Sequence, residues 1–261
     1  MSELLVLALH RVGRPPANAT IRGLFTSTGL LRFQIALLKW LGFEFKTLSE
    51  AVLAPARSRT AVLTFDDGYE DNYHSGVPVL ERENVPATLF VIAGDVGKRD
   101  VTWAEAGDST QADLMTWDML KDLGRLGWEI GSHCDEHVHL ARRSQTEQAQ
   151  LIATGLSRIE AELGFRPISF AYPYGSHDDG TVEVLRKSGI RIAVTTERPG
   201  TAELDPANDL FRVKRLALGG WAWHHYVKAF IRTLRVVGPD LGLGTRRGIA
   251  DAGVSSVREE I

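Results

Sequence analysis

Two adjacent aspartates, Asp66 and Asp67, are the residues of this sequence best suited to chemistry. They follow the apolar run Ala61-Val62-Leu63, which predicts a buried strand that ends at the carboxylates. Burial and mutual repulsion both raise the pKa of a carboxyl group, and a bound cation or a shared proton removes that conflict. Gly68 allows a sharp turn here. We expect one Asp to bind a metal and its neighbour to hold or accept a proton; the alternative is an ordinary Asp-Asp-Gly turn.

A second polar cluster ends another short apolar strand, Trp128 to Ser132. His133 follows directly, and His137 lies four positions further, so both imidazoles can face one point on a helical turn or in a compact loop. Neutral imidazole suits Zn, Fe, Co or Ni. One carboxylate and two imidazoles make three ligands with a position left open for water, which is the pattern of a catalytic metal site.

Six stretches of the sequence together resemble a known family. They are Thr64 to Gly68 (TFDDG), Leu114 to Asp118 (LMTWD), Gly131 to His137 (GSHCDEH), Phe170 to Gly175 (FAYPYG), Thr195 to Glu197 and Arg212 to Leu216. Their order is similar to that of the polysaccharide deacetylases, the NodB-homology group of carbohydrate esterase family 4, over roughly residues 4–218. The resemblance implies that Asp67, His133 and His137 bind the metal and that Asp66 is the general base.

The reaction implied by this resemblance removes an N-acetyl group from an amino sugar. A divalent metal, with zinc as first candidate and cobalt, nickel or iron as alternatives, lowers the pKa of a bound water to about 7. That water would attack the amide carbonyl while Asp66 takes its proton. In similar enzymes a backbone N–H of the Pro-Tyr-Gly stretch, here that of Tyr174, stabilises the oxyanion. The resemblance therefore places Tyr172, Pro173 and Tyr174 at the substrate.

The sequence departs from the family pattern at several positions. Ala171 stands where the family has an Arg that orients the base, and Arg166 and Arg215 are the candidates to replace it. Val138 stands where Pro or Ser is usual, and Cys134 where Ser or Thr is common. As the only cysteine, Cys134 excludes an intramolecular disulfide, and we expect it to pack as a small neutral residue rather than to bind the metal.

The general acid is expected at the N-terminal end of the domain. The C-terminal part lacks the family's Leu-x-x-His motif, which His224 and His225 do not match. Leu4 to Leu9 predict an apolar strand that ends in His10, and this stretch resembles the Tyr-His-x-Val opening of a circularly permuted branch that includes exopolysaccharide de-N-acetylases. The resemblance implies that His10 protonates the leaving amine. The alternative is a surface His that caps a strand end.

Strands and helices alternate along the chain. Strands are predicted at 4–9, 60–65, 87–92, 128–132, 168–171, 190–195 and 211–216, and helices near 29–41, 72–83, 116–126, 144–163, 180–188 and 222–235. This alternation predicts a parallel α/β fold, and its seven repeats predict a TIM-barrel-like, distorted (β/α)7 barrel. The candidate site residues His10, Asp66, Asp67, His133 and Tyr172 all follow the carboxyl end of a predicted strand, where such barrels carry their active sites.

The segment 94–115 is longer than a usual connection and holds Trp103 in its middle. Because it follows a strand, we expect it on the catalytic face. An exposed Trp103 could stack on a sugar ring there; the alternative is that Trp103 only anchors the loop.

Length and composition limit the remaining interpretation. The 261 residues are expected to form one deacetylase domain over 1–240 and a C-terminal tail over 241–261. The net charge of −3 does not suggest nucleic-acid binding. Neither a signal peptide nor a transmembrane run is visible, so a cytoplasmic protein is expected.

For residues 221–237, a last barrel helix that packs on the sheet is favoured over an amphipathic helix that lies on a membrane surface. Oligomeric state is left open.

The sequence thus predicts a metal-dependent deacetylase of an N-acetylated sugar in a polysaccharide, an oligosaccharide or a sugar-linked precursor. Two alternatives remain at this point. One is a metal-dependent amidase or deformylase that acts on a non-polymeric amide, and the other is a non-catalytic carbohydrate-binding barrel. The intact cluster of Asp66, Asp67, His133 and His137 argues against the latter, because a binding module has no need of a buried charged cluster.

Overall fold

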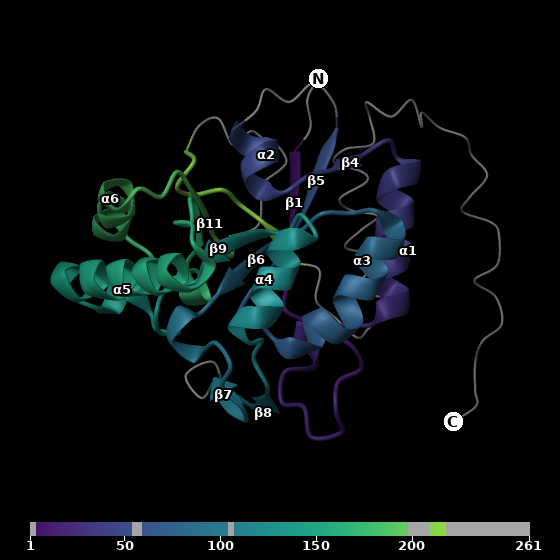
Figure 1. Cartoon of the computed structure of the whole chain (residues 1–261), viewed down its shortest axis with the longest axis horizontal. Helices are drawn as coiled ribbons and strands as arrows, with labels where there is room; N and C mark the ends of the chain where they lie inside the picture. The colour runs from purple at the N-terminus through teal and green to yellow at the C-terminus, as the bar shows by residue number, and fades with distance from the viewer. Residues whose placement is uncertain (1–3, 54–58, 104–106, 198–208, 218–261) are drawn as a thin grey trace. The chain divides into compact units, whose positions relative to one another are not determined.

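The computed structural model describes residues 4–53, 59–103, 107–197 and 209–217, in which helices surround one parallel sheet (Figure 1). The sheet strands in chain order are β1 (Leu4–Leu9), β4 (Glu44–Phe45), β5 (Thr60–Phe65), β6 (Thr88–Val91), β9 (Glu129–Ser132), β10 (Ser169–Ala171), β11 (Ile192–Val194) and β12 (Leu216–Ala217). In space they follow the order β11-β10-β9-β6-β5-β1-β12, and β4 also pairs with β5.

The α-helices that cover this sheet in the described residues are α1 (Thr28–Trp40), α2 (Leu48–Leu53), α3 (Val77–Glu83), α4 (Trp117–Arg125), α5 (Gln145–Leu163) and α6 (Asp179–Ser188). A wider helical turn, Asn72–Gly76, precedes α3. The predicted start and end of α5 are confirmed: Ser144 and Glu147 form a reciprocal capping box, and Gly164 ends the helix in a left-handed conformation. The predicted helices within the described residues agree with the observed ones within two residues, whereas the short α2 was not predicted.

The segment 209–217 closes the sheet into a ring. The Ala193 N–H of β11 donates to the Leu210 carbonyl at 2.8 Å, and the Thr195 N–H donates to the Val213 carbonyl at 2.9 Å. Farther along, Leu216 of β12 pairs with Leu7 of β1. The two edge strands are thereby joined, and the distorted (β/α)7 barrel is confirmed.

The predicted strand at 211–216 is wrong in its extent. Only Leu216–Ala217 form a strand, and Val213 makes an isolated bridge to Val194. The segment pairs with β11 at its start and with β1 at its end, so it does not run along either partner for long. The other predicted sheet strands agree with the observed ones within two residues, and the short β4 was missed.

Every residue of β1 and β5 is buried, because the barrel interior covers one face of each strand and helices cover the other. Apolar side chains fill the interior, among them Val6, Val62, Phe90 and Val194. Side chains that leave this core at the carboxyl ends of the strands therefore converge above it.

Two small additions border the carboxyl end of the barrel. One joins the short parallel strands β2 (Arg11–Val12) and β3 (Phe25–Thr26), and the other is the antiparallel hairpin of β7 (Val101–Trp103) and β8 (Asp108–Ala112). They lie side by side (Figure 1), and the Thr20 N–H of the first donates to the Thr110 hydroxyl of the second at 3.0 Å. The expected long polar loop thus contains a hairpin, which the sequence pattern did not reveal.

Within the part of the chain that the structure describes, no helix has both the length and the hydropathy that crossing a bilayer requires. The predicted helix at 222–235, the domain limit at 240 and the tail at 241–261 lie outside the described residues. The cytoplasmic location stays a prediction.

Candidate active site

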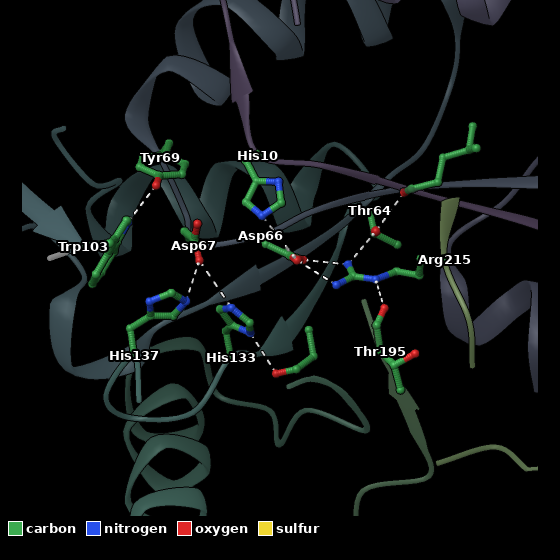
Figure 2. A network of polar contacts seen from close by, with 12 residues as sticks. His10, Thr64, Asp66, Asp67, Tyr69, Trp103, His133, His137, Thr195 and Arg215 are labelled. Atoms are coloured by element: carbon green, nitrogen blue, oxygen red, sulfur yellow. Dashed lines mark hydrogen bonds and ion pairs between the residues drawn. The ribbon is translucent and has the colours of Figure 1, made fainter. Parts of the chain in front are cut away.

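The sequence-predicted residues meet at the carboxyl end of the barrel, as Figure 2 shows. His10 follows β1, the two aspartates follow β5, and His133 follows β9. The turn after β5 is unusual, because Asp67 has a φ of 72° and Gly68 a φ of 77°. A left-handed aspartate costs on the order of 1–2 kcal/mol. Such strain in a native turn points to a functional requirement for the direction of the Asp67 side chain.

Asp67 faces two imidazoles. Its Oδ1 lies 3.3 Å from His133 Nε2 and 3.4 Å from His137 Nε2, and all three side chains are largely buried. His133 Nδ1 lies 2.7 Å from the Ala171 carbonyl, which can only accept a hydrogen bond, so the proton of a neutral His133 ring sits on Nδ1. His133 Nε2 then turns a lone pair toward Asp67 Oδ1, an oxygen that has no hydrogen-bond partner among the described residues.

Electrostatics at Asp67 favour a positive charge between these ligand atoms. Burial raises the pKa of Asp67, but the neighbouring imidazoles of His137 and His133 outweigh it and hold the pKa well below its usual range. Burial lowers the pKa of His133, but Asp67 and Asp66 reverse that effect and raise it. Burial lowers the pKa of His137 to about 4, so this ring stays neutral near pH 7 and keeps a lone pair for a ligand.

This donor set fits a divalent cation. The three ligand atoms lie within 4.8 Å of one another and are the only such group found among the described residues. Metal–ligand bonds of about 2.0–2.1 Å at tetrahedral angles separate neighbouring ligands by about 3.3 Å. The separations of 3.3 and 3.4 Å between Asp67 and the two imidazoles match that value.

Asp66 faces the other way and is paired completely. Arg215 Nη1 donates to Asp66 Oδ1 at 2.8 Å, and Nη2 donates to Oδ2 at 2.7 Å. Arg215 also donates to the Thr64 hydroxyl at 2.9 Å and to the Thr195 carbonyl at 3.0 Å, and its side chain is 1% exposed. Burial raises the pKa of Asp66, but the Arg215 charge and hydrogen bonds, aided by His133 and His10, bring it below its usual value.

Of the two arginines considered for the position lost at Ala171, Arg215 contacts Asp66. Arg166 lies at the surface, where it donates to Glu160 and to the Ser188 carbonyl. Arg215 reaches Asp66 because the segment 209–217 lies between β11 and β1 and closes the ring there. Ala171 lies on β10, on the other side of β11 from this segment.

His10 lies on the open side of Asp66. Its Nε2 is 4.0 Å from Asp66 Oδ2, and its side chain is 29% exposed. The next residue fixes the end of β1: Arg11 Nε donates to Asp71 Oδ2 at 2.7 Å, and the Val12 N–H donates to Asp71 Oδ1 at 2.9 Å. His10 is therefore reachable from solvent while its backbone is held.

Two residues expected at the substrate are buried instead. Trp103 is only 9% exposed, which does not fit the first of its two alternatives, an exposed indole that stacks on a sugar ring. Its Nε1 donates to the Tyr69 hydroxyl at 2.6 Å, which favours the anchoring alternative. Tyr172 is fully buried and donates to the Phe211 carbonyl at 2.9 Å, so its phenol does not face the site. The loop after β10 turns outward only later, at the half-buried Tyr174.

The loop after β10 is sharply bent. Pro173 is buried, and Tyr174 has a φ of 56°. Gly175 is required next to it, because a Cβ there would lie 2.0 Å from the Thr196 hydroxyl. This bend brings the Tyr174 ring to 4.2 Å from the His137 ring, between centroids.

Cys134 packs as expected. It is fully buried, and burial raises the pKa of its thiol to about 12, so it stays neutral. Sequence reasoning missed the contacts that Thr64 and Thr195 make with Arg215. Both residues stand in stretches that carry the family resemblance, but nothing in their spacing indicated the partner.

A parallel barrel whose carboxyl end holds a carboxylate–imidazole–imidazole cluster beside a second carboxylate has the layout of a barrel enzyme with a possible metal site at the carboxyl ends of its strands. The family follows from the sequence: residues 54–193 match the polysaccharide deacetylase family, and the chain belongs to it. It is therefore a hydrolase of carbon–nitrogen bonds other than peptide bonds.

Named relatives agree with this family. The poly-beta-1,6-N-acetyl-D-glucosamine N-deacetylase of Staphylococcus aureus (strain MRSA252) is 24% identical over 250 residues, which cover 87% of this chain and 82% of that protein. The structure of IcaB from Ammonifex degensii is similar with a TM-score of 0.72 at 27% identity, covering 87% of this chain and 96% of the other. The Streptococcus pyogenes deacetylase PplD shares the fold, with a TM-score of 0.70 at 22% identity, covering 87% and 97%.

Proposed function

We propose that this protein removes N-acetyl groups from amino sugars of a polysaccharide or oligosaccharide in a metal-dependent reaction. One observation carries the proposal: Asp66 and Asp67 are adjacent and buried, yet Asp66 is fully paired with Arg215, whereas Asp67 presents to two imidazoles an oxygen that has no hydrogen-bond partner in the described structure. The first is suited to accept a proton, and the second to bind a cation. The N-acetylglucosamine polymer named for the Staphylococcus aureus relative supports the sugar class.

Asp67, His133 and His137 would hold the metal, with zinc as the first candidate and cobalt, nickel or iron as alternatives. When bound, such a metal supplies Lewis acidity that polarises the amide carbonyl and lowers the pKa of a water. His137 is already neutral near pH 7, so protons compete little for its lone pair.

Asp66 would act as the general base. Arg215 keeps this carboxylate ionised and fixes its plane, so it is ready to take a proton from the attacking water. The water oxygen bonds to the carbonyl carbon, and the backbone N–H of Tyr174 is the proposed donor to the resulting oxyanion. The C–N bond then breaks, and His10, on the open side of Asp66, gives its proton to the leaving amine. The products are acetate and the free amino sugar.

Acetate release tests the proposal. The purified protein is freed of metal, reloaded with Zn²⁺, Co²⁺ or Ni²⁺, and incubated with N-acetylglucosamine oligomers of several lengths. We expect release that depends on metal, is abolished in Asp67→Asn together with metal binding, and is abolished in Asp66→Asn while metal stays bound.

The alternatives give different results. Release from acetanilides or formamides but not from sugar oligomers would replace the sugar substrate by a non-polymeric amide. Sugar binding without any release, from a protein that holds stoichiometric metal, would contradict the enzymatic proposal and favour a binding module.

A further inference from the structure

The two imidazoles of the proposed metal site are held in different ways. His133 is fixed by its backbone partner, because its Nδ1 donates to the Ala171 carbonyl at 2.7 Å. His137 has no such bond: its Nδ1 is buried and finds no hydrogen-bond partner among the described residues. Metal-binding histidines are usually oriented through the ring nitrogen that does not bind the metal. Something else must therefore keep His137 Nε2 directed at Asp67.

Two aromatic rings contact the His137 ring and can hold its orientation. The Trp103 indole lies 4.5 Å from the His137 ring, between centroids, at an interplanar angle of 51°. The Tyr174 ring lies 4.2 Å away at 52°. The Trp103 contact lies at the short end of the range of about 4.5–7 Å that aromatic pairs favour, and the Tyr174 contact is closer still. A rotation of His137 about its Cβ–Cγ bond would push the imidazole edge into these neighbours.

Trp103 is itself held firmly. Its Nε1 donates to the buried Tyr69 hydroxyl at 2.6 Å, as Figure 2 shows, and Tyr69 follows the Asp66–Asp67 motif by two residues. The guanidinium of Arg11 lies 4.9 Å from the Tyr69 ring centroid. The indole is therefore tied by its edge to the turn that carries Asp67, while its ring contacts His137.

We propose that Trp103 is a positioning residue that orients His137 as a metal ligand, with Tyr69 as the residue that fixes the indole. The proposal rests on the metal site proposed above. It also gives the β7–β8 hairpin a defined role. Trp103 at the end of β7 would orient His137 through ring packing, as the Ala171 carbonyl orients His133 through a hydrogen bond.

A double-mutant cycle on metal affinity tests the proposal without using activity. Wild type, Trp103→Ala, His137→Ala and the double variant are titrated in their metal-free forms. The probe is Cu²⁺, because it is the divalent ion bound most tightly and keeps a two-ligand site measurable. Loss of an orienting partner typically weakens metal affinity by about 10–100-fold. We expect that loss for Trp103→Ala in wild type and less than about a twofold change in the His137→Ala background, because Trp103 acts through His137.

Trp128→Phe is the matched control. Trp128 is a buried tryptophan stacked on Phe65 at 5.5 Å between centroids, and the ring contacts of His133 and His137 in the described structure do not include it. It should leave Cu²⁺ affinity unchanged. Trp103→Phe, which retains a ring, should regain most of the affinity, and Tyr69→Phe, which removes the acceptor of the indole N–H, should lose part of it. If Trp103→Ala does not fold, the Cu²⁺ affinities of Trp103→Phe and Tyr69→Phe test the positioning role in its place.

The outcomes separate the two proposals. If wild type binds no Cu²⁺ and no Zn²⁺, the metal site itself is refuted. If wild type binds metal but Trp103→Ala weakens the affinity equally in both backgrounds, or not at all, the positioning role is refuted and the metal site stands.

Discussion

Asp66 and Asp67 are adjacent and equally buried, but their surroundings differ in kind. The Asp66 side consists of a planar guanidinium, two threonines and one histidine at its open edge. The Asp67 side consists of two imidazoles and their aromatic neighbours, and one carboxylate oxygen lacks a hydrogen-bond partner within the described part of the chain. The comparison shows how one turn can pair one carboxylate with a fixed guanidinium and turn its neighbour toward two imidazoles.

The two sides are also built from different parts of the chain. Arg215 stands 149 positions after Asp66 and reaches it only because the last described segment closes the barrel. The Asp67 side is assembled from the loop after β9 and the β7–β8 hairpin. We therefore expect changes on the Asp66 side to affect the stability of the barrel as well as catalysis, and changes on the Asp67 side to affect mainly metal binding.

The largest effect is expected from Arg215→Met, which leaves Asp66 buried without its partner. Removal of one member of a buried ion pair typically costs about 3–5 kcal/mol. We expect a loss of this size in the free energy of unfolding, measured with urea on the metal-free protein, together with turnover near background. Arg166→Met is the control, because Arg166 is a surface residue, and it should change stability by less than about 0.5 kcal/mol. An Arg215→Met protein with wild-type turnover would contradict the role of Arg215 in orienting the base.

His10→Ala should have the next largest effect, and only on catalysis. Loss of a general acid typically lowers turnover by about 10²–10⁴-fold. The loss should be far smaller for 4-nitrophenyl acetate, because nitrophenolate departs without needing a proton. His74→Ala is the control, since His74 is exposed and paired with Glu70 away from the site. Equal losses on the amide and on the activated ester would show that His10 does not protonate the leaving group.

The pH dependence of stability should also separate the two sides. The pKa of Asp66 is lower in the folded protein than its ordinary value of 3.8, so the folded state favours the carboxylate. This contribution is fully present above the unfolded pKa and is lost as the pH falls through it toward the folded pKa. In Arg215→Met, burial without the guanidinium should raise the Asp66 pKa instead. The difference in unfolding free energy between wild type and Arg215→Met, measured in urea with a chelator present, should therefore shrink toward acid pH. Parallel curves would contradict this account.

Much of this arrangement could be predicted from strand ends and motifs. His10, Asp66, Asp67 and His133 each follow an apolar run, and the carboxyl ends of parallel strands meet at one edge. The sequence limited the candidates for the partner of Asp66 to Arg166 and Arg215, but it could not show which of the two makes the contact. That choice depends on ring closure, in which the segment 209–217 pairs with β11 and then with β1, and no local pattern encodes it.

Aromatic side chains were the least predictable part of the site. Trp103 stands in a polar stretch that favours an exposed loop, but the stretch folds into a hairpin that turns the indole inward onto Tyr69. Tyr172 follows a strand end as His10, Asp66 and His133 do, yet its side chain lies on the helix-covered face with Phe170 and Phe211. Which face a residue takes just beyond a strand depends on the turn that follows, and the sharp bend at Tyr174 was not visible in the sequence.

The smallest effect is expected from Cys134→Ala, which tests whether the Asp67 side has a fourth protein ligand. Cys134 directly follows His133, but its thiol is buried and its pKa is raised to about 12, so no thiolate is present near pH 7. We expect unchanged metal stoichiometry and affinity, and a loss of about 1 kcal/mol or less in unfolding free energy from the vacated volume. A drop in Zn²⁺ affinity of tenfold or more would place sulfur among the ligands. Such a result would also weaken the contrast between the two aspartates, because the metal would then be bound by a thiolate as well as by the Asp67 carboxylate.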